Sequence, residues 1–159
     1  MKKLLAAGLL AVGFIAATPR PAAADATIFW GFSSTPTNRA ARGFAVGISL
    51  IVVGFEFEYA NTSEDVVEAA PGLRTGMFNG LLQTPTKMQL YVTAGGGFFR
   101  ERFNDVGETN FGTNIGGGVK IPLFGPLRIR VDYRVFNLRG SNTVYMHPQR
   151  FYVGGNVAF

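Results

Sequence analysis

FYVGGNVAF, residues Phe151–Phe159, ends the chain and is the most informative stretch for its architecture. In an extended strand every second residue shares a face, which gives this stretch an apolar row: Phe151, Val153, Gly155, Val157 and Phe159. The opposite row carries small or polar residues and one tyrosine: Arg150, Tyr152, Gly154, Asn156 and Ala158. An apolar outer row opposite a small or polar inner row is typical of one wall of a membrane barrel.

The other terminus carries the signature of an exported protein. Met1–Lys3 is positively charged, Leu4–Ala17 is an apolar run of fourteen residues, and Ala22–Ala24 forms a small-residue tail before Asp25. This order predicts a secretory signal peptide, residues 1–24, cleaved after Ala24. Fourteen residues fall short of the roughly 20 that a membrane-spanning helix needs. We therefore predict two segments, the signal peptide at 1–24 and one domain at 25–159.

Composition restricts the remaining domain. The chain has no cysteine, so neither a disulfide nor a lipid-modified cysteine can form. Removing the leader leaves 12 basic and 10 acidic residues, so the charge gives no argument for nucleic-acid binding. No later segment reaches the apolar length of a transmembrane helix. An integral membrane protein of this composition must be a closed barrel, because lipid satisfies no backbone polar groups.

Alternation within the domain predicts strands throughout. In Leu127–Phe136 the apolar side chains face one way and Arg128, Arg130, Asp132 and Arg134 face the other. Val53–Tyr59 repeats the design, with its aromatic residues opposite Glu56 and Glu58. Such charged rows are solvated on the outside of a soluble sheet, whereas in a membrane barrel they line a polar lumen.

The full pattern predicts an all-β fold, an eight-stranded antiparallel up-and-down transmembrane barrel. The expected strands are 26–34, 42–50, 53–61, 74–83, 88–102, 110–121, 127–137 and 150–159. Short connections at 51–52, 84–87 and 122–126 alternate with long ones at 35–41, 62–73, 103–109 and 138–149. The turn at 51–52 follows from a change of phase in the apolar row, although Ile51 and Val52 are poor turn formers. The triple glycines 95–97 and 116–118 suit the crowded interior of a narrow barrel better than a phosphate loop.

Short turns at one end and long loops at the other are typical of outer-membrane barrels, with the long loops outside the cell. In that orientation six outward aromatic side chains lie near the external rim as an expected aromatic girdle: Phe44, Tyr59, Phe98, Phe111, Tyr133 and Phe151.

The chain resembles the small outer-membrane barrels of the outer membrane protein A transmembrane domain and outer membrane protein X type. The resemblance rests on the architecture and on a C-terminal assembly signal, here Gly154, Val157 and the terminal Phe159. No motif identifies a subfamily. The resemblance implies an outer-membrane location, contact with outer-membrane lipid, and passage through the secretion and barrel-assembly machineries. It implies no cofactor, and the sequence leaves any ligand of the external loops unspecified.

The polar rows suggest an ionic network in the lumen. Glu56 and Arg130 are expected at similar heights on opposite strands. We hypothesise that Glu56 and Glu58 meet three arginines, joined by an aspartate and a lysine: Arg128, Arg130, Arg134, Asp132 and Lys120. An eight-stranded interior is only wide enough for side chains to fill it, which favours a structural plug over a conducting pore. Related barrels carry comparable internal salt bridges that restrict or gate a narrow pore.

Two other functions compete with a structural, surface-interaction or narrow-pore role. A soluble periplasmic lipocalin-like barrel would bind a small apolar ligand and would turn Ile129, Val131 and Tyr133 inward. Lipid A palmitoyltransferases and deacylases share the barrel and use His with Ser. Here the single histidine, His147, has Gln149 where a deacylase-like pattern has Ser. Ser63 and Ser141 are the nearest loop hydroxyls by sequence, and no pattern in the sequence places either of them beside His147. We therefore predict no enzymatic activity.

Metal binding has equally little support in the sequence. One histidine, no cysteine and a loose acidic loop with Glu64, Asp65 and Glu68 provide no ligand spacing for a metal site. The acidic loop 62–73 and the more basic loop 138–149 are expected to face outward, where binding functions often reside.

Overall fold

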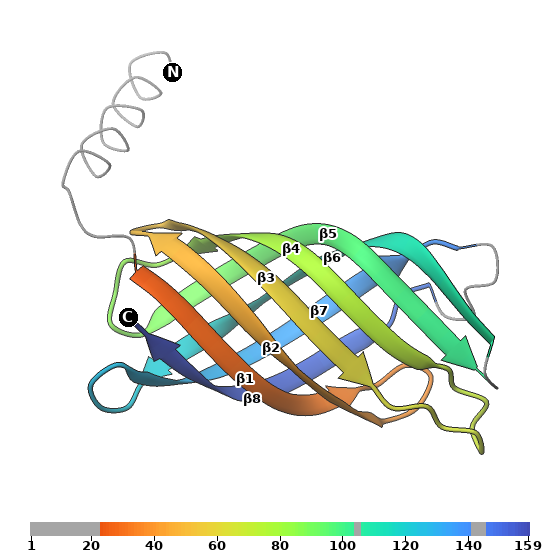
Figure 1. The fold of residues 1–159 in the computed structure, drawn as a ribbon. Helices are drawn as coiled ribbons and strands as arrows, with labels where there is room; N and C mark the ends of the chain where they lie inside the picture. The colour runs from red at the N-terminus through yellow and green to blue at the C-terminus, as the bar shows by residue number, and fades with distance from the viewer. Residues whose placement is uncertain (1–22, 104–105, 141–145) are drawn as a thin grey trace, which may run out of the picture.

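Eight antiparallel strands pair in sequence order and close into a barrel in the computed structural model, which describes residues 23–103, 106–140 and 146–159 (Figure 1). The strands are β1 Ala23–Ser33, β2 Arg39–Leu50, β3 Val53–Thr62, β4 Gly72–Gln83, β5 Gln89–Phe103, β6 Val106–Pro122, β7 Leu127–Leu138 and β8 Gln149–Ala158. No helix in the described part of the chain is long and apolar enough to cross a membrane.

The barrel closes between the first strand and the last. β8 pairs antiparallel with β1 from Asp25 opposite Ala158 to Ser33 opposite Arg150. Beyond this ladder, the backbones of Ala24 and Phe159 exchange both N–H···O=C bonds. Closure removes the two free edges that an open sheet would present, so each strand finds backbone partners on both sides.

Alternation along each strand separates a polar interior from an apolar exterior. Arg130 and Arg134 on β7 have no exposed surface, whereas Tyr133 between them is 45% exposed. Large apolar residues are exposed around the whole wall, including Trp30, Phe78 and Ile115. The lipocalin-like alternative is therefore wrong, because it requires the apolar row to face inward. A membrane barrel requires the orientation observed.

The expected strand ends agree with the structure to within three residues, except at the start of β6. The connections at 51–52, 84–88 and 123–126 lie at the same end as the chain termini, and 34–38, 63–71 and 139–148 lie at the other (Figure 1). We call these the terminal end and the loop end.

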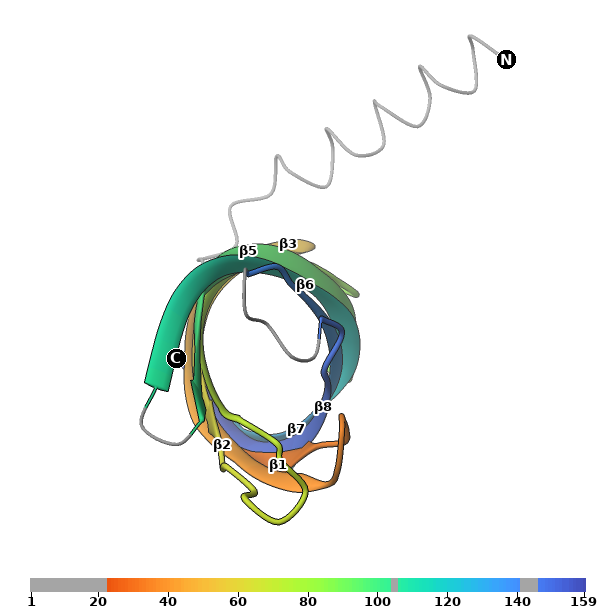
Figure 2. The ribbon, with the colours of Figure 1, turned by 90° about the vertical axis from the view of Figure 1, so that its right-hand side faces the viewer.

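The expected long connection at 103–109 is wrong. β5 continues to Phe103 and β6 begins at Val106, with Phe103 opposite Val106 in the ladder. At 15 and 17 residues these are the longest strands, and they extend past the rest of the barrel at the loop end (Figures 1 and 2). Polar residues occupy both faces of this extension, so the sequence there lacks the contrast between rows that marks a wall strand.

Inward glycines make room for large side chains on neighbouring strands. A Cβ on Gly118 of β6 would collide with the Tyr91 hydroxyl and with the Val131 carbonyl oxygen. A Cβ on Gly43 of β2 would collide with the ring of Phe29, which stacks on Tyr152 with ring centroids 4.0 Å apart. These glycines are thus part of the packing of the lumen.

Replacing an inward glycine is expected to destabilise the barrel. Gly118→Ala overpacks the site beside Tyr91 and should lower the free energy of unfolding by about 1–3 kcal/mol. Gly155 on β8 is the matched control, because a Cβ there has no atom within 4 Å. Urea unfolding in detergent micelles measures both variants. Equal stability of Gly118→Ala and Gly155→Ala would contradict this account of the packing.

The backbone of the turn at 51–52 is strained, and a substitution at Ile51 can relieve the strain. Leu50 lies opposite Val53 in the ladder, so the hairpin has a two-residue loop, and Ile51 in it has a φ of 25°. A β-branched residue adopts positive φ only at a cost that glycine avoids. Ile51→Gly should therefore raise the free energy of unfolding by about 1 kcal/mol in the same assay. Val52→Gly, at a position without positive φ, should lower it; a loss for both variants would contradict the prediction.

Candidate functional site

Six buried charged side chains meet inside the barrel. β3 contributes Glu56 and Glu58, and the alternation of β7 and β8 turns four more inward: Arg130, Asp132, Arg134 and Arg150. All six are at most 4% exposed. β3 and β7 are four strands apart in the closed order, so they form opposite walls and their side chains meet across the lumen. We call these six residues the ionic layer.

Glu56 is the centre of the contacts across the lumen. Both terminal nitrogens of Arg130 donate to its carboxylate, the Nη2 of Arg130 to Oε1 at 3.2 Å. The Nη2 of Arg134 also donates to Glu56 Oε1, at 2.8 Å. The fork of Arg130 therefore holds the carboxylate through two hydrogen bonds, the arrangement in which a guanidinium pairs most strongly.

Asp132 lies between the two arginines on the same strand. It accepts from Arg130 Nη2 at 3.0 Å and from Arg134 Nε at 2.9 Å. The hydroxyl of Tyr91 donates to Asp132 and accepts from Arg130 Nε at 2.7 Å. The guanidinium of Arg130 also lies 4.9 Å from the Tyr91 ring centroid. Each carboxylate of this cluster is thus paired with cations and supported by hydrogen bonds.

Glu58 forms the neighbouring cluster towards the loop end. Arg150 donates to Glu58 Oε1, Arg134 Nη2 lies 3.2 Å from Oε2, and the Tyr152 hydroxyl donates to Oε2 at 3.1 Å. The ionic layer therefore contains three arginines and three carboxylates. Equal numbers allow every charge to have an opposite partner, which a dry interior requires.

Two cations of the hypothesised network pair elsewhere. Lys120 on β6 forms its ion pair with Asp25. Arg128 donates to the side-chain amide oxygen of Gln89 at 2.7 Å, and within the described residues it forms no ion pair. Arg128 lies two residues nearer the terminal end than Arg130, whereas Lys120 lies opposite Arg130 in the ladder but its side chain pairs with Asp25. The structure thus brings Glu56, Glu58, Arg130, Asp132 and Arg134 together and leaves these two cations outside.

Sequence reasoning missed four participants: Arg150, Tyr152, Tyr91 and Asp25. Arg150 and Tyr152 belong to the inner row of the final strand, so their inward direction was readable. Their height was not, because it depends on the register of β8 against β7, where Arg150 lies opposite Arg134. The pairing of Asp25 with Lys120 similarly depends on how the strands are staggered around the closed barrel.

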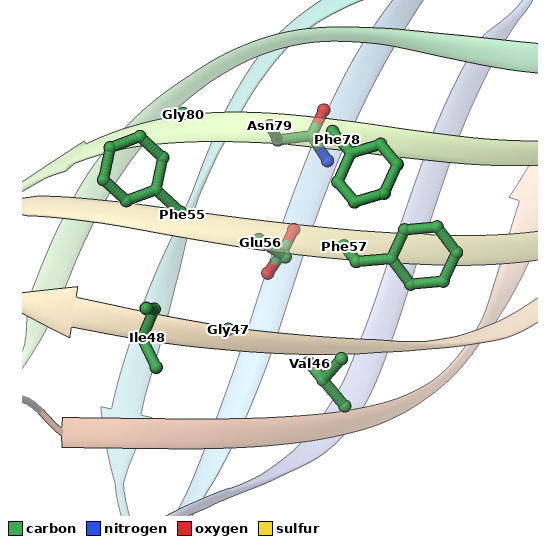
Figure 3. Close-up of a pocket in the computed structure, with 9 residues that line it drawn as sticks. All are labelled: Val46, Gly47, Ile48, Phe55, Glu56, Phe57, Phe78, Asn79 and Gly80. Carbon is green, nitrogen blue, oxygen red and sulfur yellow. The ribbon is translucent and has the colours of Figure 1, made fainter.

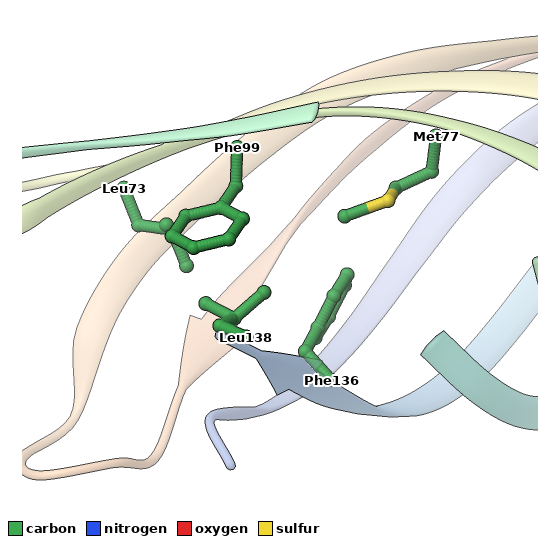
Figure 4. Packing of buried hydrophobic residues seen from close by; sticks show 5 residues of the cluster. All are labelled: Leu73, Met77, Phe99, Phe136 and Leu138. Atoms are coloured by element: carbon green, nitrogen blue, oxygen red, sulfur yellow. The ribbon is translucent and has the colours of Figure 1, made fainter. Parts of the chain in front are cut away.

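A second, apolar layer fills the lumen between the ionic layer and the loop end. Its five buried side chains point towards one another from β4, β5 and β7 (Figure 4): Leu73, Met77, Phe99, Phe136 and Leu138. The guanidinium of Arg150 lies 4.6 Å from the Phe136 ring centroid, so the two layers are in direct contact. The sequence did not reveal this apolar layer, because both rows of these strands include apolar residues.

On the exterior, the six residues of the expected girdle all face outward and form three cross-strand pairs. Phe44 lies opposite Tyr59, Phe98 opposite Phe111, and Tyr133 opposite Phe151. The first two pairs have ring contacts with centroids 5.8 and 5.9 Å apart. In the predicted C-terminal assembly signal, Gly154 faces inward, and Val157 and Phe159 face outward with exposures of 37% and 76%.

The residues considered for catalysis lie in the loops. His147 and Ser63 are exposed, in different connections at the loop end, and Ser141 lies outside the described residues. Among the described residues, no hydrogen bond or ion pair involves the His147 imidazole, and no group of His, Cys, Asp and Glu could hold a metal ion.

Comparison with protein-family models found no match for this sequence, and comparison with curated proteins found none either. Solved structures do share the fold. The N-terminal barrel domain of Pseudomonas aeruginosa OprF has a TM-score of 0.63 at 14% identity, covering 86% of this chain and 97% of that chain. Neisserial surface protein A (NspA) has a TM-score of 0.66 at 17% identity, covering 87% of this chain and 96% of that chain.

An enzyme shares the fold as well. The outer membrane enzyme PagL has a TM-score of 0.53 at 12% identity, covering 84% of this chain and 98% of that chain. This chain therefore has the fold of the small eight-stranded outer-membrane β-barrels. Because that fold includes an enzyme, activity has to be argued from the residues of this chain.

Removing one charge from the ionic layer should be strongly destabilising. Glu56→Gln leaves Arg130 and Arg134 without the carboxylate that both contact, and should cost about 3–5 kcal/mol of unfolding free energy. Urea unfolding in micelles measures the loss. Glu68→Gln makes the same chemical change in an exposed loop and should stay within about 0.5 kcal/mol of the unaltered protein. Similar values for the two variants would mean that the lumen is wet and Glu56 is solvated.

Proposed function

We propose that this chain is an exported, integral outer-membrane protein with a non-enzymatic role, whose lumen is closed and whose barrel presents a recognition surface at its loop end. The observation that carries the proposal is the ionic layer. It bridges opposite walls through Arg130, Arg134 and Glu56, with no exposed surface on either arginine. A water-filled pore would need these side chains to lie along the wall.

The exterior supports the membrane location. A soluble monomer rarely exposes a large continuous apolar surface, and here such a surface surrounds the barrel. The three outward aromatic pairs lie towards the loop end, as members of an aromatic girdle would at the external interface. Val157 and Phe159 remain accessible on the outer face of β8, where the barrel-assembly machinery could bind an assembly signal.

The proposal includes removal of residues 1–24 on export. β1 begins at Ala23, so cleavage after Ala24 would remove two residues from the terminal end of a ladder that continues to Ser33. Asp25 would then be the first residue, and its carboxylate pairs with Lys120 inside the barrel. Strand β1 keeps all nine of its described pairs with β8 after such a cleavage, since that ladder starts at Asp25.

Two layers in series support closure rather than a narrow pore. An ion that passed the ionic layer would still meet the side chains of Phe99, Phe136 and the rest of the apolar layer. Charged groups that open transiently can exchange partners, but an apolar constriction excludes ions by dewetting. The combination therefore favours a scaffold over a channel.

Closure can be tested in planar bilayers after the barrel has been isolated from the outer membrane and shown to shift on SDS gels when boiled. We expect no steady current from the unaltered barrel. Glu56→Ala with Arg130→Ala opens only the ionic layer, and Phe99→Ala with Phe136→Ala opens only the apolar layer, so each pair should also stay closed. The four substitutions together should conduct.

Each variant must keep the heat-dependent gel shift, which separates a closed barrel from an unfolded one. A steady current through the unaltered barrel would overturn the closed lumen. A soluble periplasmic protein without a gel shift would overturn the membrane location itself.

A further inference from the structure

On the outward face of the loop end, two arginines oppose each other without an ion pair to any described residue. Beyond the outward aromatics, β4 exposes Arg74 and β5 exposes Arg100, and the two residues are directly opposite in the ladder. Like charges at opposed positions destabilise a sheet. Among the described residues, neither guanidinium forms an ion pair or a side-chain hydrogen bond with another residue. An anion placed between them would remove the repulsion.

The two arginines line a groove of about 670 Å³ on the outside of β3, β4 and β5. Arg102 adds a third guanidinium, Asn61 adds a polar side chain, and Glu64 is the one carboxylate in the lining. The groove is therefore positively charged overall and contains the hydrogen-bond donors that suit a phosphate group.

An apolar hollow of about 550 Å³ lies nearer the terminal end of the barrel, over β2, β3 and β4 (Figure 3). Its sides are outward apolar side chains: Val46, Ile48, Phe55, Phe57 and Phe78. Its floor includes Gly80, which has no side chain, and Glu56, whose side chain points into the lumen. The hollow exposes hydrocarbon at the depth where a membrane places acyl chains.

Two outward glycines on β4 line the path from groove to hollow. A Cβ on Gly76 or Gly80 would find its nearest atom at 4.0 or 3.9 Å. The position of a Cβ is therefore free at Gly76 and Gly80. At the inward Gly43 and Gly118, by contrast, protein atoms fill that position. Glycine weakens a strand interior unless something approaches the backbone closely. No backbone or side chain of this protein makes that approach at Gly76 or Gly80, so these positions leave room for a group from outside the chain.

We propose that the wall formed by β3, β4 and β5 binds one phosphorylated glycolipid of the outer leaflet. A phosphate lies between Arg74 and Arg100, and an acyl chain follows Gly76 and Gly80 down to the hollow. Arg74 precedes Gly76 by two residues, a step of about 6–7 Å along the strand, which matches the passage from head group to chain at a membrane interface. The proposal rests on the outer-membrane location proposed above.

Charge and apolar hollow together favour a lipid over a soluble polyanion. A soluble polyanion would need only the arginines and would leave the hollow and both glycines without a role. A lipid uses both features at once, and the outward Phe98 beside Gly76 marks the level where they meet.

The test uses the folded full barrel in phosphatidylcholine nanodiscs containing lipid A with both phosphates or the same lipid enzymatically dephosphorylated. Native mass spectrometry after mild detergent exchange counts the lipid A molecules retained. We expect one phosphorylated molecule per barrel, retained at least about tenfold better than the dephosphorylated form. Arg74→Glu and Arg100→Glu should each abolish that preference. Arg139→Glu, the same change at the loop end beyond β7, should keep it.

The apolar half has its own pair of variants. Gly80→Leu fills the hollow and should reduce retention of both lipid forms, whereas Gly155→Leu places the same side chain on the outward face of β8 and should leave retention unchanged. Each variant is first checked for the heat-dependent gel shift.

Equal retention of the two lipid forms by a folded barrel would overturn the lipid site and leave the closed outer-membrane barrel intact. Binding of inositol hexaphosphate to barrels in pure phosphatidylcholine discs, lost in Arg74→Glu but unaffected by Gly80→Leu, would assign the groove to a soluble polyanion and overturn the lipid. A chain that fails to insert would overturn both proposals.

Discussion

The narrow interior of an eight-stranded barrel constrains every inward position of this chain. Because the lumen is only as wide as the side chains that fill it, a large residue on one strand requires a small residue beside it. Tyr91 fits because Gly118 lies next to it, and Phe29 fits because of Gly43. These two inward glycines therefore have a steric cause, and they determine where the large side chains beside them can lie.

Filling this space with charges requires balance. Three arginines and three carboxylates share one buried layer, and each guanidinium contacts at least one carboxylate. Apolar residues of similar volume would fill the lumen as well, and replacing buried ion pairs in this way is often neutral for stability. Charges add a constraint on register, because a slip by one residue would turn Arg130, Asp132 and Arg134 towards the apolar exterior. The ionic layer thus makes the wrong pairing of β7 far more costly.

The sequence predicted those features that depend on a single strand. Alternation gave the eight strands, their inward and outward rows and the two-residue turn at 51–52. Features that depend on several strands were out of reach. The height of Arg150 depends on the register of β8 against β7, and the apolar layer depends on which inward apolar residues of β4, β5 and β7 lie at the same height. The extension of β5 and β6 was not predicted for a different reason. Beyond the apolar exterior, both faces of these strands carry polar residues, so the sequence has no apolar row that would mark a strand.

The inward and outward faces of one strand contact different neighbours, and β4 shows this most clearly. Its inward residues, such as Met77, pack against the side chains of other strands, so protein atoms determine what fits there. Its outward residues Gly76 and Gly80 face open space, and protein packing gives no reason for their small size. Whatever covers that face must account for them, together with the opposed Arg74 and Arg100. In the lipid complex that we propose, stability and recognition would reside on opposite faces of the same backbone, and a substitution on one face would alter its function with little effect on the other.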